Sequence, residues 1–134
     1  MLEYRPWGAY EVLHDTSEAK VKVIEVEPRS RLSYQSHTKR QEQWTVIYGE
    51  LTVVLDEKEY TVQVGESIFI PLGSKHRAWN ETDKPVRFVE VQTGTYFGED
   101  DIVRLADDYD RADENLFEHL EDGNYIGGLT MPKK

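Results

Sequence analysis

The sequence predicts an all-β domain, a sandwich or barrel built from seven or eight short strands. Residues 20–92 are rich in β-branched and aromatic residues, and turn residues interrupt them at intervals of roughly 8–12 positions. No helical pattern of useful length separates the apolar runs, so a parallel sheet with crossover helices is not expected. With 134 residues and a 38% hydrophobic composition, the chain fits a single domain with its own core.

The first predicted strand is Lys20–Val26, in which apolar and polar residues alternate until a proline follows. Trp44–Tyr48 is a second apolar run, and Gly49 closes it. The polar residues 56–59 lie between two further runs and predict a hairpin, and Pro71–Gly73 predicts a turn. The remaining predicted strands are residues 51–55, 60–64, 67–70, 76–80 and 86–92.

The pattern changes after Gly98, where alternation gives way to an acidic segment. Asp113 can cap a short helix that Gly123 ends. This helix would carry three apolar residues on one face: Leu116, Phe117 and Leu120. We therefore predict a β domain over residues 1–111 and an acidic C-terminal extension with a short helix over residues 112–134.

The charge and composition exclude several classes of protein. A net charge of −10 argues against nucleic acid as a partner, because phosphate backbones attract a basic surface. No apolar run approaches the roughly 18–20 residues that span a bilayer, and residues 1–12 lack a signal-peptide pattern, so no membrane partner is expected. The absence of cysteine excludes disulfides and thiolate metal ligands and fits a cytoplasmic location, which we predict.

The basic residues are concentrated in two short stretches. Residues 29–40 and 75–87 together hold eight of the 16 lysines and arginines. A small anionic ligand could bind where the two stretches meet, despite the negative net charge. The alternative is that these residues lie on solvated strand edges, which lysine and arginine commonly protect.

Two polar clusters carry possible chemistry. Gln35 and His37 are two positions apart and would project from the same face of a strand, and Glu42 follows at the start of the next strand. His76 opens a later strand and can meet the other three if the strands close into one barrel. Two imidazoles, one carboxylate and one amide oxygen suit Zn(II), Mn(II), Co(II), Ni(II) or Fe(II), and contain too much nitrogen for a dedicated calcium site.

The spacing of these clusters resembles the paired motifs of cupins. His-x4-Glu-x6-Gly runs from His37 to Gly49, and Gly-x5-Pro-x-Gly-x2-His-x3-Asn runs from Gly65 to Asn80. Gln35 stands where the first of two cupin histidines usually stands. Across residues 5–111 the chain resembles type II mannose-6-phosphate isomerases in further motifs: Arg5-Pro-Trp-Gly-x-Tyr10, Leu32-Ser-x-Gln35-x-His37, Arg40-x-Glu42-x-Trp44, Gly65-Glu-Ser, His76-Arg77, Glu90-Val-Gln, Gly94-x-Tyr96-x-Gly98-Glu-Asp-Asp-Ile-Val-Arg104 and Asp108-Tyr109.

The resemblance implies a cupin double-stranded β-helix, a jelly-roll-like barrel, and a homodimer. In that family the domain usually follows a mannose-1-phosphate guanylyltransferase domain. The present sequence contains no counterpart of that domain and no nucleotide-binding glycine-rich loop. We therefore expect a standalone domain without nucleotidyl transfer.

The resemblance also implies a metal-dependent interconversion of mannose 6-phosphate and fructose 6-phosphate. The implied cofactor is a divalent ion, with zinc as the first candidate, and its implied ligands are Gln35, His37, Glu42 and His76. The first candidate for the substrate phosphate is Arg104, and the others are Arg40, Arg77 and Lys39. The candidate bases are Lys75, Glu90 and a metal-bound water.

Other functions fit the same residues. A sugar-phosphate-binding module without turnover is the main alternative, and it predicts affinity for sugar phosphate without proton exchange at C2. A metal-dependent oxygenase is a third reading, since one fold supports many chemistries. The motif spacing does not separate mannose 6-phosphate from glucose 6-phosphate.

Overall fold

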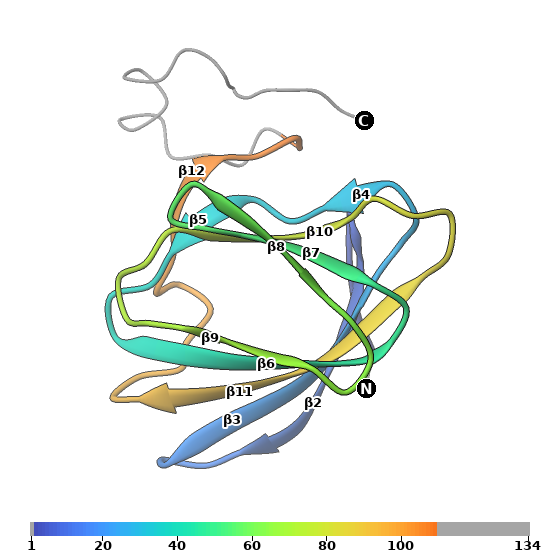
Figure 1. Ribbon diagram of the computed structural model, residues 1–134. Coiled ribbons are helices and arrows are strands. Elements are labelled where there is room, and N and C mark those ends of the chain that lie inside the picture. Colours follow the sequence, from blue (N-terminus) through green and yellow to red (C-terminus); the bar gives the residue numbers. More distant parts are fainter. Residues whose placement is uncertain (1, 110–134) are drawn as a thin grey trace.

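The computed structural model describes residues 2–109, which form β-strands and no helix (Figure 1). The all-β prediction is confirmed. The helix predicted after Asp113 and the domain boundary predicted at residue 111 lie outside the described residues. Within the described range no helix is long and apolar enough to cross a membrane. The twelve strands are β1 (Leu2–Arg5), β2 (Gly8–Asp15), β3 (Ala19–Val26), β4 (Ser30–Arg31), β5 (Tyr34–Ser36), β6 (Arg40–Tyr48), β7 (Leu51–Leu55), β8 (Lys58–Val62), β9 (Ser67–Ile70), β10 (His76–Asn80), β11 (Val86–Gly94) and β12 (Val103–Ala106).

The strands form two sheets that face each other across a shared interior (Figure 1). One sheet has the order β1-β2-β3-β11-β6-β9, and the other has the order β12-β5-β10-β7-β8, with β4 paired to β10. Every pair in the register is antiparallel. The chain crosses repeatedly between the two sheets, which is the arrangement of a double-stranded β-helix, as predicted.

The interior divides into an apolar end and a charged end along the same strands. In β11 the inward residues start with Val86 and Phe88 and continue with Glu90 and Gln92, and all four are buried. The neighbouring strands β3 and β6 show the same change, from valine, isoleucine and tryptophan to Lys22, Glu42 and Arg40. The apolar end supplies the free energy of burial that holds the sheets together, and the charged end is where a polar ligand could enter.

The hairpin predicted at residues 56–59 is present, with a tighter turn than expected. β7 ends at Leu55 and β8 begins at Lys58, so only Asp56 and Glu57 connect them. Both have positive φ, 48° and 76°, as a two-residue turn of type I′ requires. The expected strand 60–64 therefore starts two residues earlier.

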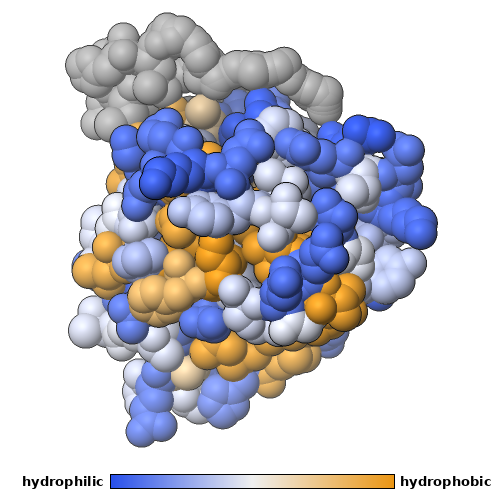
Figure 2. Space-filling model, viewed as in Figure 1, coloured by the Kyte–Doolittle hydropathy of each residue, from blue (hydrophilic) through white to orange (hydrophobic). Residues whose placement is uncertain are grey.

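Some of the exposed apolar side chains lie on or next to β8 and β9. Figure 2 shows apolar surface over the region where β8 and β9 approach each other. Tyr60, Val64 and Phe69 are among the exposed apolar residues, with relative exposures of 42%, 60% and 46%. The homodimer that the family resemblance implies stays a prediction.

Candidate metal centre and its cavity

Three potential metal ligands converge across the interior. His37 directly follows β5 and His76 opens β10, its neighbour in the same sheet, while Glu42 lies on β6 in the opposite sheet. The side chains are buried, and one potential ligand atom from each lies within 4.8 Å of the others. Glu42 Oε2 is 3.3 Å from His37 Nε2, and Glu42 Oε1 is 3.9 Å from His76 Nε2. The structure thus brings together three of the four predicted ligands.

The two imidazoles are oriented by main-chain carbonyl groups. His37 Nδ1 lies 2.6 Å from the Asp101 carbonyl oxygen, and His76 Nδ1 lies 3.0 Å from that of Ser74. A carbonyl oxygen only accepts, so each Nδ1 carries the proton and each Nε2 presents its lone pair toward Glu42. Burial lowers the pKa of His37 to about 4 and also lowers the pKa of His76. Both rings are therefore neutral at physiological pH, the form that binds a metal.

Gln35, the fourth predicted ligand, lies opposite His76 in the β5–β10 register and lines the same cavity. Its Nε2 donates hydrogen bonds to the carbonyl oxygen and to Oγ of Ser33, at 3.3 Å and 3.0 Å. Because the nitrogen is used in this way, the amide oxygen is the atom that can serve as a ligand. The donor set of two imidazole nitrogens, one carboxylate and one amide oxygen fits a divalent transition metal or zinc.

Arg40 contacts the same donor atoms. Its Nε donates to Glu42 Oε2 at 2.8 Å, and its Nη2 lies 3.2 Å from His37 Nε2. Trp44 Nε1 donates to the other carboxylate oxygen of Glu42 at 2.8 Å. Burial alone would raise the pKa of Glu42, but the nearby His76, Arg40 and His37 outweigh it and hold the pKa at about 2. Glu42 is therefore ionised, and a metal would compete with Arg40 for its oxygen and for His37.

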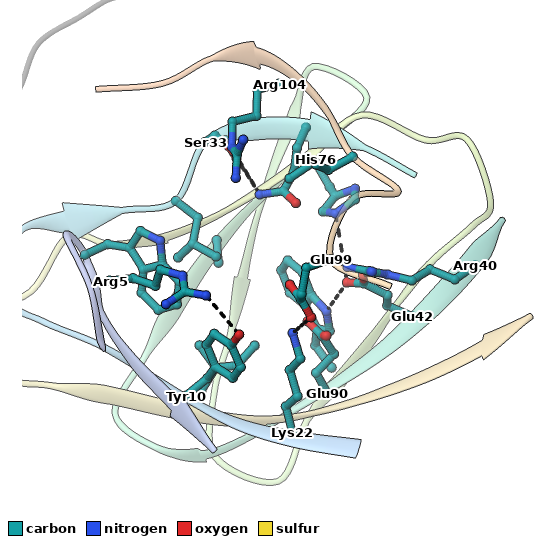
Figure 3. Close-up of a pocket in the computed structure, with 17 residues that line it drawn as sticks. Arg5, Tyr10, Lys22, Ser33, Arg40, Glu42, His76, Glu90, Glu99 and Arg104 are labelled. Carbon is teal, nitrogen blue, oxygen red and sulfur yellow. Dashed lines mark hydrogen bonds and ion pairs between the residues drawn. The ribbon is translucent and has the colours of Figure 1, made fainter. Parts of the chain in front are cut away.

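A partly open cavity lies beside this cluster. Its wall combines aromatic residues with charged residues of both signs (Figure 3). The positive charges come from four strands of the two sheets, and the negative charges from β6, β11 and the segment before β12. The charged residues that line the cavity are Arg5, Lys22, Arg40, Arg104, Glu42, Glu90 and Glu99. Such a mixed wall suits a small, polar, anionic ligand.

The structure places only two of the four predicted phosphate contacts on the cavity wall, Arg104 and Arg40. Arg77 is buried elsewhere and donates hydrogen bonds to the carbonyl oxygens of Leu32 and Ala106, at 2.7 Å and 3.2 Å, so it ties β10 to its neighbouring segments. The ammonium group of Lys39 lies over the ring of Tyr96 at 5.3 Å. Arg77 and Lys39 therefore do not line the cavity.

The two side chains predicted as bases are placed differently. Glu90 is buried and lines the cavity. The Lys75 side chain is 49% exposed, pairs with Glu57 at 3.5 Å and does not line the cavity. Because successive residues in an extended chain point to opposite faces, His76 faces inward while Lys75, which precedes it, points away. Lys75 therefore lies outside the cavity in which a base would act.

Four further cavity residues, Arg5, Tyr10, Lys22 and Glu99, had no role in the predicted site. A signal for Lys22 was present in the sequence, since it shares its strand face with Ile24 and Val26, and all three are buried. A lysine on the inward face of an alternating strand is unusual, because a buried ammonium group needs a partner. Glu99 lies in a segment without periodicity, so its only signal was its place in the motif from Gly94 to Arg104.

The carboxyl group of Glu90 has an unusual environment. Burial and the neighbouring Glu42 raise its pKa to about 7, although Lys22, Arg40 and a hydrogen bond from Gln92 oppose the shift. A carboxyl group with a pKa near neutral pH can both take up and release a proton under physiological conditions.

Glu90→Gln should therefore change stability in a pH-dependent way. In the folded protein the pKa of Glu90 is raised above 4.5, so the cost of burying its charge is full above pH 7 and disappears as the pH falls toward 4.5. Glutamine has no such cost at any pH. We expect the variant's free energy of unfolding, relative to that of the wild type, to be larger at pH 8 than at pH 5 by about 2–3 kcal/mol, so that the substitution stabilises the protein more at pH 8. Urea unfolding at both pH values checks this, and an equal difference at the two would contradict the raised pKa.

Comparisons with known proteins agree with this architecture. The sequence profile of the family described as "Mannose-6-phosphate isomerase C-terminal" matches residues 2–107. The alginate biosynthesis protein AlgA of Pseudomonas aeruginosa is 43% identical over 111 residues, which cover 83% of this chain and 23% of AlgA. The xanthan biosynthesis protein XanB of Xanthomonas campestris is 44% identical over 109 residues, covering 81% of this chain and 23% of XanB. The chain thus spans about a quarter of the length of these relatives.

Solved structures show the same fold. A sugar phosphate isomerase of the cupin superfamily from Silicibacter pomeroyi is 27% identical, with a TM-score of 0.55 over 62% of this chain and 58% of that chain. The capsular polysaccharide assembling protein CapF from Staphylococcus aureus is 20% identical, with a TM-score of 0.70 over 78% of this chain and 31% of that chain. The likeness to CapF concerns the fold alone.

Proposed function

This chain belongs to the family of mannose-6-phosphate isomerase C-terminal domains, and from that premise we propose that its cavity interconverts mannose 6-phosphate and fructose 6-phosphate with a divalent metal ion. The observation that carries the proposal is the buried His37–Glu42–His76 cluster, which borders a cavity with lysine and arginine on its wall. The cluster offers ligands for a metal, and the cations offer partners for a phosphate group.

We propose that His37, Glu42, His76 and Gln35 hold the metal. When bound, a divalent ion supplies positive charge that stabilises negative charge developing on the sugar oxygens during the reaction. Gln35 is neutral, so a site with Glu42 as its one carboxylate keeps a net positive charge. Zinc stays the first candidate, and manganese, cobalt, nickel and iron fit the same donors.

Glu90 is the proposed base. Conversion of the open-chain aldose to the ketose removes a proton from C2 and adds one to C1, while the hydroxyl proton on O2 leaves and O1 gains a proton. The ionised carboxylate of Glu90 would take the proton from C2 and return it to C1, so that the base is regenerated. A pKa of about 7 suits both steps, because the proton is neither held too tightly nor released too readily.

A sugar-phosphate-binding module without turnover is the second candidate, and Arg40 favours it. The guanidinium group occupies lone pairs of His37 and Glu42 that a metal would use, and it balances the charge of Glu42 without a metal. In that case the cavity would bind a sugar phosphate through its cations and leave C2 unchanged.

Proton exchange separates the two candidates. Mannose 6-phosphate would be incubated in D₂O with protein loaded with Zn(II), Mn(II) or Co(II), and the C2 position followed by proton NMR. Loss of the C2 proton signal together with new fructose 6-phosphate signals supports the isomerase. Saturable binding of mannose 6-phosphate without exchange under any metal supports the binding module. Parallel samples of glucose 6-phosphate define the sugar preference.

A further inference from the structure

Lys22 is a buried cation in the charged half of the interior. Only 5% of its side chain is exposed, and it lines the cavity. Its ammonium group contacts Glu99 Oε2 at 2.7 Å and lies 4.2 Å from the centre of the Tyr10 ring. Burying an ammonium group is strongly unfavourable unless an anion compensates it, so this position on the wall is suited to a negative charge.

Arg5 brings a second cation to the same aromatic ring. Its guanidinium carbon lies 5.1 Å from the centre of the Tyr10 ring, and its Nη2 donates to the Tyr10 hydroxyl at 3.1 Å. The Arg5 side chain also lines the cavity. In Figure 3, Arg5 and Tyr10 lie on the side of the cavity opposite Arg40 and Glu42, and Lys22 lies between the two sides, beside Glu90 and Glu99. Two cations therefore contact Tyr10 on the cavity wall, and their contacts do not include His37, Glu42 or His76.

The anion at this end comes from outside the strands. Glu99 lies in the segment 95–102 between β11 and β12, and its side chain is 49% exposed. One of its carboxylate oxygens contacts both Lys22, at 2.7 Å, and Lys20, at 3.3 Å. The half-exposed carboxylate of Glu99 thus compensates the buried ammonium group of Lys22. Both residues line the cavity.

The segment that carries Glu99 is anchored on both sides of it. Thr95 N donates to the carbonyl oxygen of Lys39 at 2.9 Å. The Asp101 carboxylate accepts hydrogen bonds from Thr38 N, Thr38 Oγ1 and Lys39 N, at 3.0, 2.9 and 2.9 Å. These contacts do not involve Glu99, so its side chain can leave Lys22 by rotation while the backbone stays in place.

We propose that Lys22, Arg5 and the Tyr10 hydroxyl bind the phosphate group of a sugar phosphate, and that the Glu99 carboxylate fills this position when no ligand is bound. The assignment rests on the proposed function for the identity of the sugar phosphate. A phosphate carries more negative charge and more acceptor oxygens than a carboxylate, so it competes effectively for the same cations. Lys20, which contacts the same oxygen of Glu99, would remain a partner for that carboxylate after the exchange.

Inorganic phosphate is the first probe, because it requires neither a metal nor turnover. Its affinity would be measured by isothermal titration calorimetry for wild type, Lys22→Met, Glu99→Gln and the control Lys58→Met, in which an exposed lysine on β8 is replaced. Lys22→Met should weaken phosphate binding roughly 10-fold or more, the loss expected for a charge-assisted hydrogen bond. Glu99→Gln should strengthen it, by roughly fivefold, because a competing anion is removed. Lys58→Met should bind as wild type does.

The Glu99→Gln result decides the proposal even if Lys22→Met fails to fold. Unchanged or weaker phosphate binding in Glu99→Gln would overturn the assignment, as would wild-type affinity in a folded Lys22→Met. If the variants bind phosphate with the predicted affinities but mannose 6-phosphate is not isomerised, the phosphate site is supported and the isomerase is rejected. Isomerisation with the same KM in wild type and Lys22→Met would uphold the isomerase and reject this phosphate site.

Discussion

Replacing His76 by alanine is expected to weaken Zn(II) binding about 100-fold or more. His76 supplies one of the two imidazole lone pairs that face Glu42, and its Nδ1 is already held by the Ser74 carbonyl oxygen. Loss of the groups that merely orient a metal ligand costs 10–100-fold in affinity, and loss of the ligand itself costs at least as much. Competition with a chromophoric chelator measures the Zn(II) affinity of both proteins at pH 7.

His14→Ala is the matched control for this experiment. His14 is an exposed histidine on β2, outside the cavity, and its replacement should leave Zn(II) affinity unchanged. Circular dichroism establishes that the His76→Ala protein is folded. Equal Zn(II) affinity in wild type and folded His76→Ala would show that the His37–Glu42–His76 cluster is not the metal site.

Glu90→Gln is expected to lower kcat for mannose 6-phosphate by roughly 10²–10⁴-fold, the usual contribution of a general base. KM should change little, because glutamine keeps the size of the side chain and its place on the cavity wall. The Glu90 pKa of about 7 further predicts that kcat/KM of the wild type falls below pH 7 as the carboxylate takes up a proton. Steady-state kinetics between pH 5 and pH 9 measure both effects.

Glu59→Gln on the exposed face of β8 is the control for charge alone, and it should keep wild-type kcat. A Glu90→Gln protein that retains most of its kcat would exclude Glu90 as the base. The proton transfer would then belong to another group on the cavity wall, and the stability experiment at pH 5 and pH 8 would still report the Glu90 pKa on its own.

The strands that form the centre of both sheets follow from local patterns in the sequence. β3 and β11 alternate cleanly, and β10 begins at His76 as expected from the turn before it. β2 escaped prediction because the register shifts between Val12 and His14, and such a bulge breaks the period of two. β12 is short and pairs with β5 through another irregularity, so it has no alternation to detect.

The candidate metal ligands could be chosen from the spacing of the two motifs, and His37, Glu42 and His76 converge in the structure. The phosphate contacts could not, since a basic stretch does not reveal which of its residues face inward. Arg40 faces the cavity while Lys39, one residue earlier, contacts Tyr96 instead. The cations proposed for the phosphate, Lys22 and Arg5, lie outside both basic stretches, and Lys22 meets Glu99 only through the tertiary fold.

A coupled assay for fructose 6-phosphate formed from mannose 6-phosphate tests the central claim most directly. Metal-stripped protein would be assayed alone and with Zn(II), Mn(II) or Co(II) added back, with His76→Ala treated in parallel. The proposed function predicts turnover that appears only with added metal and is lost in His76→Ala. Absence of turnover with every metal, in protein that binds both metal and mannose 6-phosphate, would contradict the isomerase and leave a sugar-phosphate-binding module.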